Sequence, residues 1–182
     1  HVDSTQMFIV GHSQGGMMAP MIAQQSGKLK GIILLAANAR PIQDMLIEQM
    51  DYLYPDSSVM DAKNYHEKKR IQQQANYAKK KKLNPKTPTD SLPFGVSATY
   101  WNFLNNYNQV KTFEKTPVQA LVLQGERDYQ VTMTDFHLWQ QAATKRKART
   151  DFISYPKLNH LFIKGEGRSV PAEYQQQGNM DE

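Results

Sequence analysis

The chain of 182 residues contains no cysteine. This absence excludes disulfide bonds, thiolate metal sites and a cysteine nucleophile. The sequence has no internal repeat, and no apolar run approaches the roughly 20 residues that a membrane-spanning helix needs. The length suits one hydrophobic core better than two. A single globular domain without a membrane span is therefore the first expectation.

Acidic residues are fewer than basic ones, with 17 Asp and Glu against 22 Lys and Arg. Such an excess raises nucleic acid or an anionic surface as a partner. The excess is local, however, because Lys79–Lys82 form one block and residues 68–70 add three cations just upstream. This stretch lacks the Gly/aromatic signature of RNA-binding sheets and the spacing of zinc fingers. We interpret the block as a solvated face and expect neither a nucleic-acid nor a membrane partner.

Four short apolar segments have the composition of strands buried on both faces. They are residues 7–10, 31–37, 118–124 and, more weakly, 150–155. Helical patterns follow the first and the third of them. Because strands that alternate with helices form parallel sheets, we predict an α/β fold with a mainly parallel sheet.

Apolar residues at helical spacing predict helices over residues 14–25 and 133–144. Gly27 stands where the first helix would take its C-terminal cap. Thr132, followed three residues later by Asp135, resembles a capping box at the start of the second helix.

Residues 40–115 interrupt the alternation. They contain no convincing sheet strand but show helical patterns at residues 42–54 and 65–81. The aromatic segment Tyr100–Tyr107 must be buried against another part of the chain. We interpret its rings as packing residues in preference to substrate contacts. The segment is predicted to be a helical insertion into the sheet domain.

Residues 8–16, FIVGHSQGG, place one serine in a glycine-rich turn between a predicted strand and a predicted helix. A nucleophilic serine in such a turn needs small residues two positions away, and Gly11 and Gly15 supply them. The helix directs its N-terminus at the turn, so the backbone N–H of Gln14 is placed to help bind an oxyanion. Ser13 is thus the candidate nucleophile in a G-x-S-x-G pattern. A turn whose serine merely caps the helix is the alternative.

A serine hydroxyl needs a base to take its proton and an acid to orient that base. His160 follows the last predicted strand and Asp128 the third, so both should reach the carboxyl edge of the sheet. Glu126 is the second candidate for the acid. His12 adjoins the serine but faces the wrong way for a base. The resulting order of serine, acid and histidine is the one expected of this architecture. The alternative is that Asp128 only forms a turn and that His160 is only a surface-loop histidine, since both would give the same sequence pattern.

The sequence resembles the α/β-hydrolase superfamily, in particular bacterial serine carboxylesterases with a helical cap. The matching segments are GHSQGGMMAP, LLAANARPIQDMLIEQMDYL, TPVQALVLQGERDYQVTMTDF and YPKLNHLFIKGEG. The resemblance implies Ser13 as nucleophile, Asp128 as orienting acid and His160 as base, with residues 40–115 as a cap that shapes the acyl or alcohol pocket. The candidate pocket residues are His12, Tyr100, Trp101 and Phe103.

Relatives of this kind cleave modest-sized esters, sometimes of hydroxycinnamic or acetyl type, and their mechanism needs no metal or cofactor. The same three residues would also serve a thioesterase, a peptidase or an acyltransferase. A non-catalytic binding module on the same fold is a further alternative.

Complete members of the superfamily have several strands before the serine turn, and a loop there gives a second oxyanion N–H. We therefore expect residues 1–182 to form a partial α/β-hydrolase domain, incomplete at its N-terminus. Its first strand would have an unpaired edge, which a second copy of the chain or an N-terminal segment would cover.

Overall fold

The computed structural model describes residues 3–56 and 58–175. Its contacts divide the chain into two compact units. The sheet unit comprises the described residues up to Ala39 and from Gln109 onward, and the helical unit comprises Arg40–Asn108. Within the described ranges, no helix combines the length and apolar character needed to cross a membrane.

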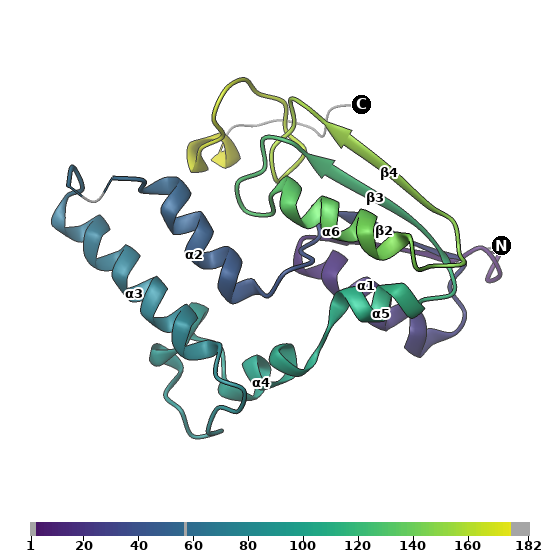
Figure 1. The fold of residues 1–182 in the computed structure, drawn as a ribbon, viewed down its shortest axis with the longest axis horizontal. Coiled ribbons are helices and arrows are strands. Elements are labelled where there is room, and N and C mark those ends of the chain that lie inside the picture. The colour runs from purple at the N-terminus through teal and green to yellow at the C-terminus, as the bar shows by residue number, and fades with distance from the viewer. Residues whose placement is uncertain (1–2, 57, 176–182) are drawn as a thin grey trace. The chain divides into compact units, whose positions relative to one another are not determined.

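The sheet unit is built on four strands in the order β1-β2-β3-β4, all of them parallel (Figure 1). They are Phe8–His12 (β1), Gly31–Leu35 (β2), Gln119–Gly125 (β3) and Thr150–Tyr155 (β4). The register places Leu34 opposite Gly11 on one side and Val122 on the other. The predicted parallel α/β sheet is confirmed, and all four carboxyl ends meet at one edge.

Three helices cover one face of this sheet: α1 (Gln14–Ser26), α5 (Gln109–Lys115) and α6 (Met133–Ala143). Ile32, Leu34 and Val122 face them from the strands, while Phe113 and Trp139 pack from the helices with ring centroids 5.0 Å apart. Burial of each such side chain contributes about 1.5–3 kcal/mol. This layer is the core that fixes the strand ends.

The two predicted helix caps have different outcomes. Gly27 has φ 62 and donates its N–H to the carbonyl of Ala23, so the left-handed C-cap of α1 is confirmed. The capping box is wrong, because Thr132 makes no side-chain cap hydrogen bond. The Asp135 carboxylate is fully buried instead and accepts the N–H of Ala39 at 2.9 Å.

Within the part of the chain that the structure describes, the opposite face of the sheet is covered only at its carboxyl end, where Leu158 and Phe162 pack on Ala36. Among the described residues, Phe8, Val10 and Ile153 remain 47%, 58% and 44% exposed. The prediction of strands buried on both faces therefore fails on this face. β1 pairs only with β2 among the described strands, and the covering of its other edge by a second copy or an N-terminal segment stays a prediction.

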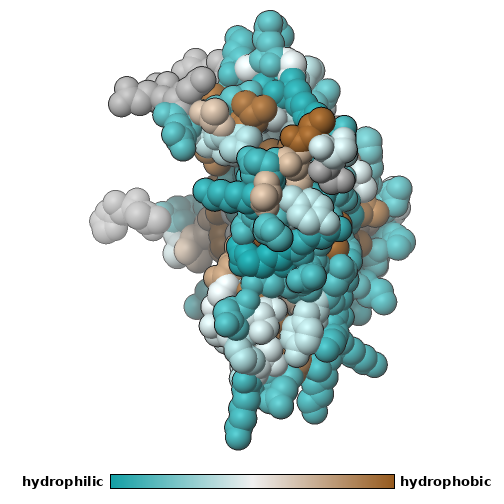
Figure 2. All heavy atoms as spheres, turned by 90° about the vertical axis from the view of Figure 1, so that its left-hand side faces the viewer, coloured by the Kyte–Doolittle hydropathy of each residue, from teal (hydrophilic) through white to brown (hydrophobic). Residues whose placement is uncertain are grey.

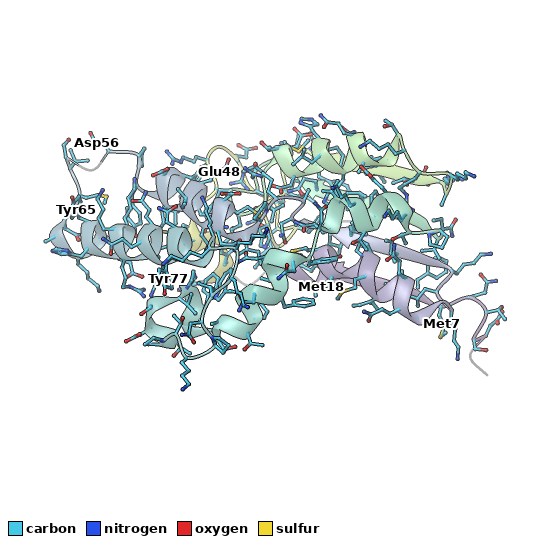
Figure 3. The ribbon with its side chains drawn as sticks, turned by 60° about the horizontal axis from the view of Figure 1, so that its bottom comes forward. Met7, Met18, Glu48, Asp56, Tyr65 and Tyr77 are labelled. Atoms are coloured by element: carbon cyan, nitrogen blue, oxygen red, sulfur yellow. The ribbon has the colours of Figure 1, made fainter. Side chains whose placement is uncertain are left out.

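The helical unit contains α2 (Ile42–Leu53), α3 (Ala62–Ala78) and α4 (Ala98–Asn106), with short 3-10 turns at Thr89–Ser91 (η1) and Pro93–Gly95 (η2). Its core gathers Leu46, Ala78, Leu83, Leu92 and Trp101. Tyr65 and Tyr77 mark the two ends of α3 (Figure 3). The face of this unit that Figure 2 turns to the viewer is mainly hydrophilic.

Two lysines of the basic block bind within the helical unit. Lys79 pairs with Asp44 at 2.7 Å, and the Lys80 ammonium lies 3.9 Å from the ring centroid of Tyr77. These contacts are those of a solvated helix end whose cations have local partners.

The predicted insertion, residues 40–115, is corrected at its C-terminal boundary. The compact helical unit ends at Asn108, because α5 packs in the sheet unit. Phe113 of α5 is fully buried there. The sequence pattern missed this because a short helix of seven residues carries only one large apolar anchor.

Candidate active site

Ser13 lies in the sharp turn between β1 and α1, with φ 54 and ψ −119. A left-handed φ is costly for a residue with a Cβ, by about 1–3 kcal/mol, and persists where the surroundings enforce it. The Ser13 N–H donates to the carbonyl of Leu35 at 2.8 Å, and its carbonyl accepts the N–H of Met17 at 3.1 Å. Strain of this kind at a strand-to-helix turn is typical of functional positions.

Close backbone packing holds this turn. A Cβ on Gly11 would lie 2.3 Å from the carbonyl oxygen of Gly15, and one on Gly16 would lie 2.5 Å from the Ala37 Cβ. A Cβ on Gly15 would meet nothing within 4 Å among the described residues. The close approach predicted for Gly15 therefore falls on Gly16, which the sequence pattern missed.

Asp128 follows β3 at the carboxyl edge and is buried, with a fully buried side chain. Its Oδ1 accepts the backbone N–H groups of Gln130 and Val131 at 2.8 and 2.9 Å. Its Oδ2 accepts the Gln124 amide at 3.1 Å and faces His160 Nδ1 at 2.7 Å. A carboxylate surrounded by donors in this way is fixed in orientation.

His160 is also buried, with a side chain 6% exposed. Because an ionised carboxylate only accepts, Nδ1 is the donor toward Asp128. In the neutral imidazole this leaves Nε2 as the acceptor, which is the tautomer that a general base needs. The structure thus brings together the predicted acid and the predicted base.

His12, the last residue of β1 and the neighbour of Ser13, contacts His160. Its Nε2 is 2.7 Å from the backbone carbonyl of His160, and the two rings are 4.7 Å apart by their centroids. Because a carbonyl only accepts, His12 Nε2 donates this bond. The residue next to Ser13 thus contacts the backbone of the predicted base, while the Ser13 hydroxyl itself has no hydrogen bond to another described residue.

The remaining candidates divide by position. Gln14 is the first residue of α1, so its N–H has no acceptor inside the helix. Glu126, the second candidate for the acid, is exposed and accepts the Ser154 hydroxyl at 2.7 Å. It makes no recorded contact with His160 among the residues the structure describes.

The aromatic candidates all lie on α4 of the helical unit. Trp101 is fully buried in the core of that unit, so its indole serves packing. Burial raises the pKa of Tyr100, whose ring packs edge-on against Trp101. Phe103 is 43% exposed and stacks on Tyr107. The role of this unit as a specificity-determining cap stays a prediction.

Sequence reasoning missed the side chains that hold the acid and the base in place. Gln124 is buried and donates to Asp128 and to the carbonyls of Gly125 and Val131. Asn159, directly before the histidine, is fully buried as well. A polar side chain at the end of an apolar strand, and an Asn-His pair in the histidine loop, are the signals that would have found them.

Comparison with known proteins identifies the family of the chain. The chain matches the serine aminopeptidase S33 family of hydrolases over residues 1–166. The chain belongs to this family. Esterase EstD of Thermotoga maritima is similar to this S33 family member, with 32% identity over 179 residues. That match covers 98% of the chain and 40% of the relative, so the chain spans less than half the length of EstD.

Solved structures of other proteins have the same fold as this S33 family member. Acetyl xylan esterase 1 from Thermoanaerobacterium sp. superposes with a TM-score of 0.50 at 14% identity, over 87% of this chain and 41% of that one. An esterase from Pyrococcus furiosus gives 0.50 at 10% identity, over 82% and 44%. Likeness at such identity shows the fold alone. The α/β-hydrolase fold predicted from the sequence is confirmed.

Proposed function

We propose that the protein is a serine esterase that hydrolyses carboxylic esters through an acyl-enzyme on Ser13. The observation that carries the proposal is the 2.7 Å contact between His160 Nδ1 and the buried Asp128 carboxylate, at the sheet edge where the strained Ser13 turn begins. The family and the EstD relative agree with hydrolase chemistry.

In the proposed reaction His160 Nε2 takes the proton of the Ser13 hydroxyl as its oxygen attacks the ester carbonyl. Asp128 keeps the imidazole oriented and stabilises its protonated form. The N–H of Gln14, at the N-terminus of α1, binds the oxyanion that develops. The tetrahedral adduct then expels the alcohol, which receives the proton from His160. Water, activated by the same imidazole, finally cleaves the acyl-serine ester.

Labelling with a fluorophosphonate tests this proposal. The probe phosphonylates an activated serine oxygen and releases fluoride, so the full-length gene product should be labelled and its Ser13→Ala variant should not. Asp128→Asn should slow labelling strongly, because an amide donor would favour the wrong imidazole tautomer. Equal labelling of the unsubstituted protein and Ser13→Ala would remove Ser13 from the mechanism.

Peptide hydrolysis is the second candidate, because the family that the chain matches is described as a serine aminopeptidase family. The same serine, histidine and aspartate would serve both reactions, and the leaving group decides between them. Matched p-nitrophenyl esters and aminoacyl p-nitroanilides separate the candidates. Preference for the anilides at equal concentration would favour the peptidase.

A further inference from the structure

Two side chains adjacent in sequence to the acid and the base share one carboxylate. Arg127, directly before Asp128, binds Glu173 with 2.5 Å between Nη2 and Oε1. Asn159, directly before His160, donates its amide to the other oxygen of Glu173 at 2.9 Å. Glu173 belongs to a short 3-10 turn, Pro171–Gln175 (η3). The acid and base segments are thus joined through a third segment of the chain.

Asn159 shapes the base loop, residues 156–165, from inside. Its Oδ1 accepts the N–H groups of Leu161 and Ile163 at 3.0 and 3.1 Å, on either side of Phe162. Phe162 has φ 59, a left-handed conformation that a bulky residue adopts only where its neighbours enforce it. The side chain of Asn159 is fully buried, and its oxygen accepts hydrogen bonds within the loop while its amide N–H donates to Glu173.

Arg127 links the acid loop, residues 126–131, to the base loop by hydrogen bonds. Its backbone N–H donates to Leu158 at 3.1 Å, and its guanidinium donates to the carbonyls of Gly167 and Glu166 at 2.9 and 3.2 Å. The guanidinium passes so close to Gly165 that a Cβ there would lie 2.2 Å from Nη1. Its side chain is only 7% exposed.

We propose that Arg127, Glu173 and Asn159 are positioning residues that lock the acid and base loops together and thereby maintain the His160–Asp128 contact during the reaction. None of the three has a recorded side-chain contact with His160 or Asp128, so they act through the backbone of the two loops. A guanidinium–carboxylate pair with little exposure holds such a geometry better than a neutral pair. The inference rests on the proposed function, whose base and acid it positions.

The test compares Glu173→Gln with Glu166→Gln in the full-length protein. Both variants remove one negative charge near the base loop, but Glu166 is 85% exposed and pairs with Lys157 at 3.4 Å. Loosened loops displace the imidazole by a fraction of an ångström or more, and misplacement on this scale costs up to about a hundredfold. We expect Glu173→Gln to lower the fluorophosphonate labelling rate about ten- to a hundredfold and Glu166→Gln to leave it unchanged.

Two further readouts separate positioning from general destabilisation. A weaker carboxylate contact stabilises the protonated imidazole less, so the midpoint of the labelling rate against pH should move to lower pH in Glu173→Gln. Partial unfolding would lower the amplitude without moving the midpoint. In the double variant with Arg127→Met, labelling should be slowed by less than the product of the two single effects, because both substitutions break the Arg127–Glu173 pair.

The low-field proton resonance of the His160 ring, measured in the Ser13→Ala background, keeps this inference distinct from the proposed function. If the unsubstituted protein is not labelled but Glu173→Gln shifts or broadens this resonance, the esterase proposal fails and the positioning role stands. If the unsubstituted protein is labelled and Glu173→Gln changes neither rate, midpoint nor resonance, the positioning role is overturned.

Discussion

The serine turn and the two loops that carry the acid and the base are held by different means. The turn has glycines packed on backbone, with Gly11 against Gly15 and Gly16 against Ala37. The loops are held by buried polar side chains, among them Gln124 and Asn159. Small-residue packing fixes a backbone by excluding alternatives, whereas hydrogen bonds fix it by satisfying donors and acceptors. The turn should therefore fail by steric overlap and the loops by lost partners.

The largest effect is expected at the turn, from Gly11→Ala. The added Cβ would lie 2.3 Å from a backbone oxygen that cannot move without shifting α1. We expect the free energy of unfolding to fall by about 3 kcal/mol and fluorophosphonate labelling to be lost. Urea unfolding monitored by circular dichroism measures the first and gel fluorescence the second.

Gly15→Ala is the matched control for this prediction. The same methyl group on Gly15, in the first turn of α1, would meet nothing within 4 Å among the described residues. Its stability should stay within about 0.5 kcal/mol of the unsubstituted protein. Equal losses of stability in the two variants would contradict the idea that close steric packing at Gly11 holds the serine turn.

The next effect is expected from Asn159→Ala in the base loop. The substitution leaves the N–H groups of Leu161 and Ile163 without their acceptor and Glu173 without a donor. A fully buried group left unsatisfied costs about 1–3 kcal/mol. These groups are only partly buried, so water can replace some of the lost bonds, and we expect a total loss of about 2–3 kcal/mol. Urea unfolding measures the loss. A change below 0.5 kcal/mol, roughly the scatter of surface substitutions, would contradict the idea that this side chain builds the loop.

The position of the serine turn could be predicted from the sequence because Gly11, Ser13 and Gly15 lie within a few residues of each other, whereas the packing of Gly16 on Ala37 could not. The strands and α1 could be predicted for the same reason, since apolar spacing and the Gly27 cap are local signals. The link through Glu173 could not, because its partners Arg127 and Asn159 come together only in the fold. The boundary at Asn108 was missed likewise, since only the tertiary core shows where Phe113 packs.

A smaller effect is expected from Gln124→Leu at the end of β3. Leucine keeps the apolar packing but removes the amide that donates to Asp128 and Val131. We expect about 1–2 kcal/mol of lost stability. Labelling should become slower but should not be abolished, because the carboxylate keeps its backbone donors. Gln119→Leu, at the exposed start of the same strand, should change neither quantity. An equal effect of the two leucines would assign the loss to the strand as a whole.

The smallest effect concerns the acid range, where Glu173 loses its charge. Burial raises the pKa of Glu173, but hydrogen bonds from Arg127, Asn159 and Ser169 outweigh it and hold the pKa below the ordinary value of 4.5. A carboxyl group with a lowered pKa in the folded state stabilises the protein fully above its unfolded pKa, and this stabilisation is lost as the pH falls through the folded pKa.

The stability advantage over Glu173→Gln should thus be present at neutral pH and shrink below about pH 4.5. It should amount to less than about 1 kcal/mol, as for partly exposed ion pairs. Urea unfolding of both proteins between about pH 3 and 7 measures it, with Glu166→Gln as the flat control. A difference that stayed constant with pH would mean that the neutral contacts of Glu173, and not its charge, join the two loops.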